Sequence, residues 1–262
     1  MRRGGLALPL LAVLALSGCG FGVRFGDYKH KFTSDVTVSG PVKVVNINSG
    51  TGRVTVTPGG TQVRIHRIVR YQDGRPHFGQ RLDAGTLTFT KDCSRCTIDY
   101  ELAVPASVAV RAHSDSGGID VRGGATADAS SDSGSVTVRS VKGAVRAHSN
   151  SGAVVVKDVG GPLDLMTDSA SIRAVRLGSP TVRAKSDSGS IRLEFATAPT
   201  DVRATTDSAS LRVAVPGGPY NVDAETGSGG RDVSGVPHNP NAPRRLYLRT
   251  DSGQLTAEQT TP

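Results

Sequence analysis

The chain has 262 residues, a formal charge of +8, no tryptophan and only 4% aromatic residues, whereas glycine contributes 32 residues. A core almost without aromatic side chains has to be built from Val, Ile, Leu and Ala, so the composition excludes a thick aromatic core and favours thin, stacked layers. The positive charge either serves only to keep the protein soluble or attracts a polyanion.

The first 18 residues have the order of a secretory signal. Two arginines near the start are followed by an apolar run over residues 6–16, which is too short to span a bilayer core of about 30 Å. The sequence LSGC at residues 16–19 resembles the lipobox of bacterial lipoproteins. That resemblance implies cleavage before Cys19 and attachment of several acyl chains such as palmitate, which together give stable anchoring. An ordinary cleaved signal with an incidental cysteine is the alternative.

A lipid anchor at Cys19 would place the protein at the extracytoplasmic face of the cell membrane. The mixed polar and basic residues 19–39 are then predicted to form a membrane-proximal tether. Export excludes nucleic acid as a partner, and it leaves anionic lipid headgroups, wall polymers or another envelope protein as candidates.

Two further cysteines, Cys93 and Cys96, form a C-x-x-C pair. They lie between two alternating segments at residues 86–90 and 97–104, which predicts a hairpin over residues 86–104 with the pair at its tip. In an oxidising compartment the pair is expected to form a structural disulfide. Free thiols, redox chemistry or a zinc site are the alternatives, although zinc would need further ligands nearby.

A short motif repeats through the central part of the chain. An acidic or amide residue, a serine and a small residue are followed by an apolar-x-apolar triplet, at spacings of 17, 18, 18, 19 and 20 residues within the first six copies. The motif copies begin at Asp115, Asp132, Asn150, Asp168, Asp187 and Asp207. So regular a period is typical of a repeat architecture.

Alternation within each repeat predicts which side chains are buried. Apolar or small residues stand five and three positions before the motif and four and six positions after it, and strands point such alternate residues to one face. Each repeat is therefore predicted to be one coil of about 18 residues with two short strands joined by a corner. Stacked coils give an all-β, parallel β-solenoid over residues 40–258, with a right-handed coil expected from the usual crossover hand.

The outward positions of the strands are predicted to face solvent. Arg and Asp alternate four positions before the motif over the first five repeats, which favours correct stacking. Three arginines recur five positions after the motif, and they are predicted to form a basic ladder that could bind a polyanion: Arg173, Arg192 and Arg212.

The recurring Ser-Gly-x-Val-x-Val units after a lipobox resemble the bacterial putative adhesin family, a domain of unknown function with β-helical repeats. The resemblance covers about residues 40–258. It implies an extracytoplasmic role in adhesion or envelope organisation, and it supplies no catalytic residues.

The aspartate column has three interpretations. Its members repeat at every corner, which indicates a structural role in which Asp and Ser bond their own backbone amides. A polysaccharide-active enzyme using paired carboxylates, or calcium bridging stacked carboxylates, are the alternatives. His113 and His148 fall two coils apart and are expected to be surface residues. No catalytic residue, cofactor or metal is therefore expected.

Residues 226–245 interrupt the period and are rich in Gly, Pro and Asn, so they are predicted to form a loop insertion. The sequence as a whole favours a non-catalytic, lipid-anchored envelope module that binds a wall polymer or a protein. The alternatives are a polysaccharide-active β-helix enzyme and an envelope scaffold that assembles end to end through its solenoid ends.

Overall fold

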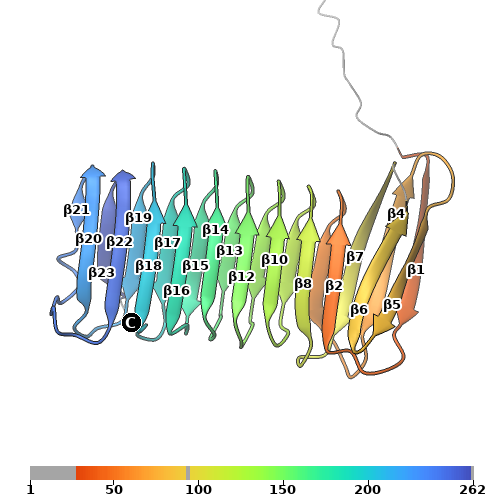
Figure 1. Ribbon diagram of the computed structural model, residues 1–262, viewed down its shortest axis with the longest axis horizontal. Helices are drawn as coiled ribbons and strands as arrows, with labels where there is room; N and C mark the ends of the chain where they lie inside the picture. Colours follow the sequence, from red (N-terminus) through yellow and green to blue (C-terminus); the bar gives the residue numbers. More distant parts are fainter. Residues whose placement is uncertain (1–27, 93–94, 261–262) are drawn as a thin grey trace, which may run out of the picture.

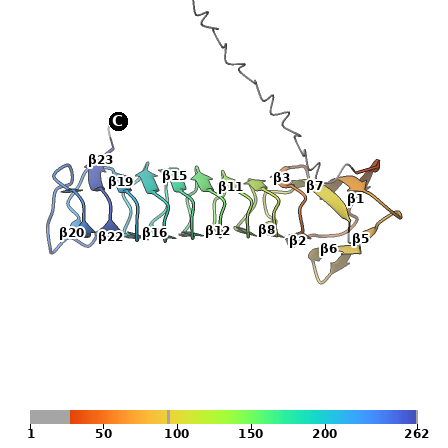
Figure 2. The ribbon, with the colours of Figure 1, turned by 90° about the horizontal axis from the view of Figure 1, so that it is seen from above.

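The computed structural model describes residues 28–92 and 95–260, which form 23 strands in two sheets. Figure 2 shows the two sheets facing each other along the whole length of the molecule. We call the 12-stranded sheet sheet A and the 11-stranded sheet sheet B. The predicted signal, Cys19 and Cys93 lie outside the described residues. Within the described ranges no helix is long and apolar enough to cross a membrane.

The strand order in each sheet follows the long axis of the molecule (Figure 1). In spatial order, sheet A contains β1 (His30–Thr37), β4 (Arg64–Tyr71), β7 (Cys96–Val104), β3 (Val54–Pro58), β9 (Ile119–Arg122), β11 (Val136–Arg139), β13 (Val154–Lys157), β15 (Ile172–Leu177), β17 (Ile191–Phe195), β19 (Leu211–Val215), β23 (Leu255–Gln259) and β21 (Arg231–Asp232). In spatial order, sheet B contains β20 (Asn221–Ser228), β22 (Arg245–Ser252), β18 (Asp201–Thr206), β16 (Thr181–Ser186), β14 (Leu163–Thr167), β12 (Val145–Ser149), β10 (Ala127–Ser131), β8 (Ala109–Ser114), β2 (Val44–Ser49), β6 (Thr86–Asp92) and β5 (His77–Asp83).

The all-β parallel solenoid predicted from the repeat is confirmed. Each central coil places one strand in sheet B and the next in sheet A, and equivalent residues of successive coils pair in parallel register, as in Val110↔Ala127 and Ala127↔Val145. The predicted inward positions of the six central repeats are all at most 4% exposed. Because these side chains are short, the two sheets enclose a thin aliphatic core. The right-handed coil remains a prediction.

The serine or threonine that precedes each motif forms hydrogen bonds within its own corner and to the previous coil. Ser131, which precedes Asp132, is buried; its hydroxyl donates to Gly117 O at 3.2 Å and accepts from Gly134 N at 2.9 Å. Equivalent pairs of hydrogen bonds connect Ser114, Ser149, Thr167 and Ser186 to their corners. The capping hydroxyl is therefore the residue before the aspartate, and not the Asp and Ser of the motif as the sequence suggested.

The second corner differs from the glycine-based expectation. Positive φ occurs at Gly123 and Gly124 as predicted, but in the next three coils the left-handed residues are Ser140, Asp158 and Arg176, with φ of 55°, 57° and 52°. Glycines 143 and 161 have no positive φ. An added Cβ at Gly161 would come within 2.3 Å of the Gly143 backbone, so close approach between coils explains that glycine.

The predicted 86–104 hairpin is wrong. β6 pairs with β5 and β2 in sheet B, whereas β7 pairs with β4 and β3 in sheet A, so the two segments belong to opposite faces of one coil. The hairpin partner of β6 is β5, through a two-residue turn at Ala84 and Gly85, both with positive φ. Alternation identified each strand correctly but could not identify its partner.

Both ends of the solenoid depart from sequential stacking. At the first end, β2 and β3 lie between the β8/β9 coil and the later β6/β7 strands, and antiparallel β4 and β1 complete sheet A. At the other end, β22 and β23 insert between β18/β19 and the earlier strands β20 and β21. The tether prediction is thus corrected for residues 30–37, which form β1, an edge strand.

The predicted loop insertion at 226–245 is partly strand. Its first residues continue β20 and its middle contains β21, which pairs with β23. The remaining segment returns to the start of β20, where Tyr220 N donates to Pro237 O at 3.0 Å and Asn239 N donates to Tyr220 O at 2.9 Å. The buried Val236 and Ala242 anchor this segment, so it covers the end of the solenoid.

Candidate functional site

A groove of about 680 Å³ runs across the outer face of sheet B, over the first residues of β8, β10, β12, β14, β16 and β18. Its floor is formed by outward side chains that stand in register on neighbouring strands: Arg111, Asp128, Arg146, Asp164, Arg183 and Arg203. This column is the alternating Arg and Asp ladder expected from the sequence. Within this column, Arg146 Nε forms an ion pair with Asp164 Oδ2 at 3.5 Å.

The alternation stops at the β16–β18 step. Arg183 and Arg203 pair directly in register, and within the described residues neither forms an ion pair. Like charges side by side on a sheet repel each other, so this step is unfavourable unless an anion binds between them. The guanidinium group favours phosphate and carboxylate because its fork of N–H donors matches their geometry.

An aromatic side chain continues the groove beyond Arg203. Tyr247 of β22 is the register partner of Arg203, and the guanidinium carbon of Arg203 lies 4.4 Å from the tyrosine ring centroid. The guanidinium carbon of Arg249 lies 4.2 Å from the centroid of the same ring. Arg249 also forms ion pairs with Asp223 at 2.8 Å and with Glu225 at 3.2 Å. Asp201 and Arg203 line both the main groove and a further hollow of about 510 Å³ beside Tyr247. No repeat or motif in the sequence pointed to this tyrosine.

The three arginines predicted to form a basic ladder do stack in register on sheet A, on β15, β17 and β19. Two of them are neutralised locally. Arg192 lies 3.5 Å from Glu194, and Arg212 donates two hydrogen bonds to Glu258 at 2.8 Å and 2.9 Å. Arg173 is left without an ion pair among the described residues, so this ladder presents less free positive charge than the groove on sheet B.

The aspartate column runs along the corner between the sheets as predicted. Its members are exposed, except the partly exposed Asp187, and they point away from the core. Asp187 accepts from Lys185 at 3.1 Å, and this hydrogen bond with its charge raises the pKa of the lysine. Because the exposed acids recur at each corner on the same scaffold, their arrangement indicates surface residues of a repeat.

The predicted Cys93–Cys96 disulfide stays a prediction because Cys93 lies outside the described residues. Cys96 begins β7 and stands opposite Tyr71 of β4, partly buried against the core.

The first end of the solenoid contains a buried cation that no sequence pattern indicated. Arg67 of β4 is only 1% exposed, and its guanidinium lies 5.3 Å from the rings of Phe78 and Phe89 and 5.9 Å from that of Tyr100. It donates to Gln80 Oε1 at 2.6 Å. Burial lowers the pKa of Arg67 and raises the pKa of the Tyr100 phenol. The Nε of Arg67 and the hydroxyl of Tyr100 are buried without a hydrogen-bond partner, and the enclosed group offers no access to a ligand.

Comparison with known proteins gives one family and several solved structures of similar fold. A family model described as Toastrack DUF4097 matches residues 86–254. A putative adhesin from Bacteroides fragilis NCTC 9343 has 16% identity and a TM-score of 0.52, over 88% of this chain and 98% of that chain. A putative adhesin from Parabacteroides merdae ATCC 43184 has 12% identity and a TM-score of 0.41, over 89% and 97% of the two chains. No curated protein matches the chain.

Proposed function

We propose that this chain, which belongs to the Toastrack DUF4097 family, is a non-catalytic binding module of the bacterial cell envelope. The membership agrees with the family resemblance read from the repeats. Solved proteins of similar fold carry the name putative adhesin, which suits a role in binding. We further propose that Cys19 is lipidated and holds the module at the extracytoplasmic face of the membrane.

The ligand that the module fits best is an anionic wall polymer lying along the groove on sheet B. The observation that carries this proposal is the unpaired step between Arg183 and Arg203, inside a groove that follows the solenoid axis. A phosphate or carboxylate group can accept hydrogen bonds from both guanidinium groups. Tyr247 offers an adjacent aromatic face, on which a sugar ring can stack. A polymer repeats such groups along its length, as the coils repeat their side chains.

The enzyme alternative is less well supported. A glycosidase needs two carboxyl groups in different environments, one of them kept protonated near neutral pH. The corner aspartates instead lie in similar exposed positions, and the groove lies over the starts of the sheet B strands whereas these corners follow the strand ends.

The test is co-sedimentation with purified cell-wall sacculi. The soluble form spanning residues 20–262 keeps every residue that the structure describes. We expect binding that weakens steadily from about 0.01 M to 1 M salt. The double variant Arg183→Ala/Arg203→Ala should lose about tenfold or more in affinity. The matched control Arg173→Ala/Arg192→Ala removes the same charge from sheet A and should stay close to the parent protein.

Two results would overturn the proposal. Equal losses in both double variants would show that the protein responds to net charge and that the groove is not the site. No binding even at the lowest salt would exclude the polymer and redirect the search to a protein partner.

A further inference from the structure

Three potential metal ligands meet at one corner of the solenoid. His113 lies near the end of β8, Asp115 lies in the corner that follows, and Asp132 lies in the equivalent corner of the next coil. One ligand atom from each lies within 4.8 Å of the other two. Within residues 28–92 and 95–260, no other group of three His, Cys, Asp or Glu side chains comes together in this way.

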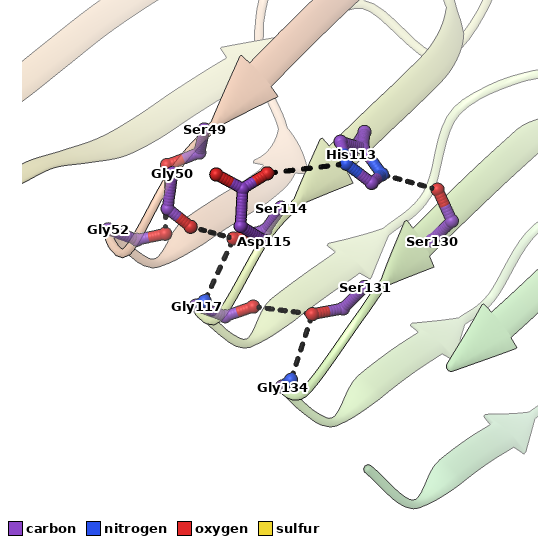
Figure 3. A network of polar contacts seen from close by, with 10 residues as sticks. All are labelled: Ser49, Gly50, Gly52, His113, Ser114, Asp115, Gly117, Ser130, Ser131 and Gly134. Carbon is purple, nitrogen blue, oxygen red and sulfur yellow. Dashed lines mark hydrogen bonds and ion pairs between the residues drawn. The ribbon is translucent and has the colours of Figure 1, made fainter. Parts of the chain in front are cut away.

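The orientation of the His113 ring suits a metal ligand. Its Nδ1 lies 3.0 Å from Ser130 Oγ, and its Nε2 lies 3.5 Å from Asp115 Oδ1 (Figure 3). With Nδ1–H donating to the serine, Nε2 keeps its lone pair on the side of the two carboxylates. A second hydrogen bond that fixes the ring and its tautomer is a usual feature of histidines that bind metals.

The repeat shows that this combination is specific to one coil. The parallel register places Ser130, His148, Met166 and Lys185 in the same column as His113. His148 is the only other histidine of that column, and its corner carries Asn150 in place of the first aspartate. An amide there provides no negative charge, and the Nε2 of His148 is buried. The scaffold is thus the same in both coils, while the donor set is complete in one.

We propose that His113, Asp115 and Asp132 form a surface site for Zn²⁺. One imidazole nitrogen and two carboxylate oxygens are ligands that zinc accepts at about 2.0–2.2 Å, in a tetrahedral arrangement with ligand atoms about 3.4 Å apart. The observed 3.5 Å between His113 and Asp115 is close to that separation, and side chains that are 41% and 62% exposed have room to adjust. The fourth position is left for water or for a ligand from another molecule.

The site connects two successive coils, because Asp132 belongs to the coil after His113 and Asp115. Bound zinc would therefore oppose separation of these coils and stabilise the folded state by mass action. Calcium is disfavoured because it prefers six to eight oxygen ligands. The site is independent of the groove, since none of its three residues lines it.

The test is isothermal titration calorimetry, with ZnCl₂ titrated into the metal-stripped, tag-free chain of residues 20–262. Thermal unfolding is measured with and without zinc. We expect one ion per chain and a higher Tm with zinc. His113→Ala and Asp132→Asn should each weaken binding by about tenfold or more and remove the Tm shift. His148→Ala, the matched control two coils away, should bind zinc as the parent protein does. The Tm of each variant without zinc verifies its folding.

Several outcomes would overturn the proposal. These are the absence of zinc binding, unchanged binding in His113→Ala, an equal loss in His148→Ala, and a preference for CaCl₂ over ZnCl₂ in the same titration. None of them bears on the sacculus experiment, so the two proposals fail separately.

Discussion

The repeat depends on a buried hydroxyl more than on the conspicuous aspartate. Ser149 is fully buried; its Oγ donates to Gly134 O at 3.0 Å and accepts from Gly152 N at 2.9 Å. One side chain therefore closes its own corner and fastens it to the previous coil. The aspartates and the following serines, in contrast, face solvent. A position that recurs as Ser or Thr can satisfy both backbone groups, and this explains why neither apolar nor charged residues occur there.

Replacing this hydroxyl should be costly. Ser149→Ala leaves a buried carbonyl and a buried N–H without a partner, and we expect the free energy of unfolding to fall by about 1–3 kcal/mol. Ser151→Ala, in the exposed part of the same corner, should change it by less than about 0.5 kcal/mol. Urea unfolding followed by circular dichroism measures both. Similar effects of the two variants would contradict the assignment of the capping role to Ser149.

Substitutions of the buried Arg67 separate the effect of its volume from the effect of its charge. Arg67→Ala leaves a void between Phe78, Phe89 and Tyr100 and should reduce the free energy of unfolding by about 3 kcal/mol. Arg67→Met fills the same space without a charge to desolvate, so its loss should be within about 1 kcal/mol. Arg64→Ala, exposed on the same strand, is the control. If methionine destabilised the protein as much as alanine, the guanidinium itself and not its volume would be responsible.

Small residues at the corners permit the close stacking of successive coils. The third residue of the motif is Gly152, Ala170, Gly189 and Ala209 in four successive coils, so no alanine stands directly on another. An added Cβ at Gly189 would lie 1.6 Å from Ala170 O. The alternation of glycine and alanine at this position therefore reflects the limited space between neighbouring corners.

Gly189→Ala should thus destabilise the protein. Three alanines would stand in consecutive corners, and the backbone would have to separate, at a cost of about 2–3 kcal/mol typical of overpacking. Gly118→Ala provides the control, because its Cβ would meet the nearest atom, Ser135 O, at an ordinary 3.5 Å. Thermal unfolding of the two variants distinguishes them; a parent-like Tm for Gly189→Ala would show that the corner has room to relax.

The central coils could be predicted from the sequence because the alternation that identifies their buried residues lies within each short strand. Alternation placed Val136 and Val138 in the core, and both are fully buried. Alternation could not identify strand partners at residues 86–104, where the two correctly predicted strands occupy different sheets and do not pair with each other. It also missed β1 and the order of the end coils. Periodicity reports which face of a strand is buried, whereas the neighbour of an edge strand depends on contacts between distant segments. The groove was partly predictable as an Arg and Asp column, but Tyr247 joins it only because β22 inserts next to β18.

The inserted coils and end segments determine which strand edges the molecule leaves open. A stack of parallel coils exposes two open edges, on which further chains could add. Here the first end finishes in two antiparallel edge strands, β1 in sheet A and β5 in sheet B, and β1 carries charged residues such as Lys31 and Asp35. At the other end, the proline-containing segment after β21 bonds to the start of β20. Proline lacks an N–H group and cannot extend a ladder. These features oppose the end-to-end scaffold considered from the sequence.

Capped ends should prevent the chain from associating end to end. The chain of residues 20–262 should remain monomeric in analytical ultracentrifugation over a wide concentration range. A variant that ends at Pro216 loses β20 to β23, so the edges of β18 and β19 and the core residues Val202 and Leu211 become exposed. That variant should associate as its concentration rises, because a long unprotected edge with apolar neighbours pairs readily with another chain. Reversible oligomers of the longer chain would instead support the scaffold, since they would show that the covered ends still pair. A monomeric, folded truncation would show that the terminal coils serve another purpose, such as placing Tyr247 beside Arg203 in the groove.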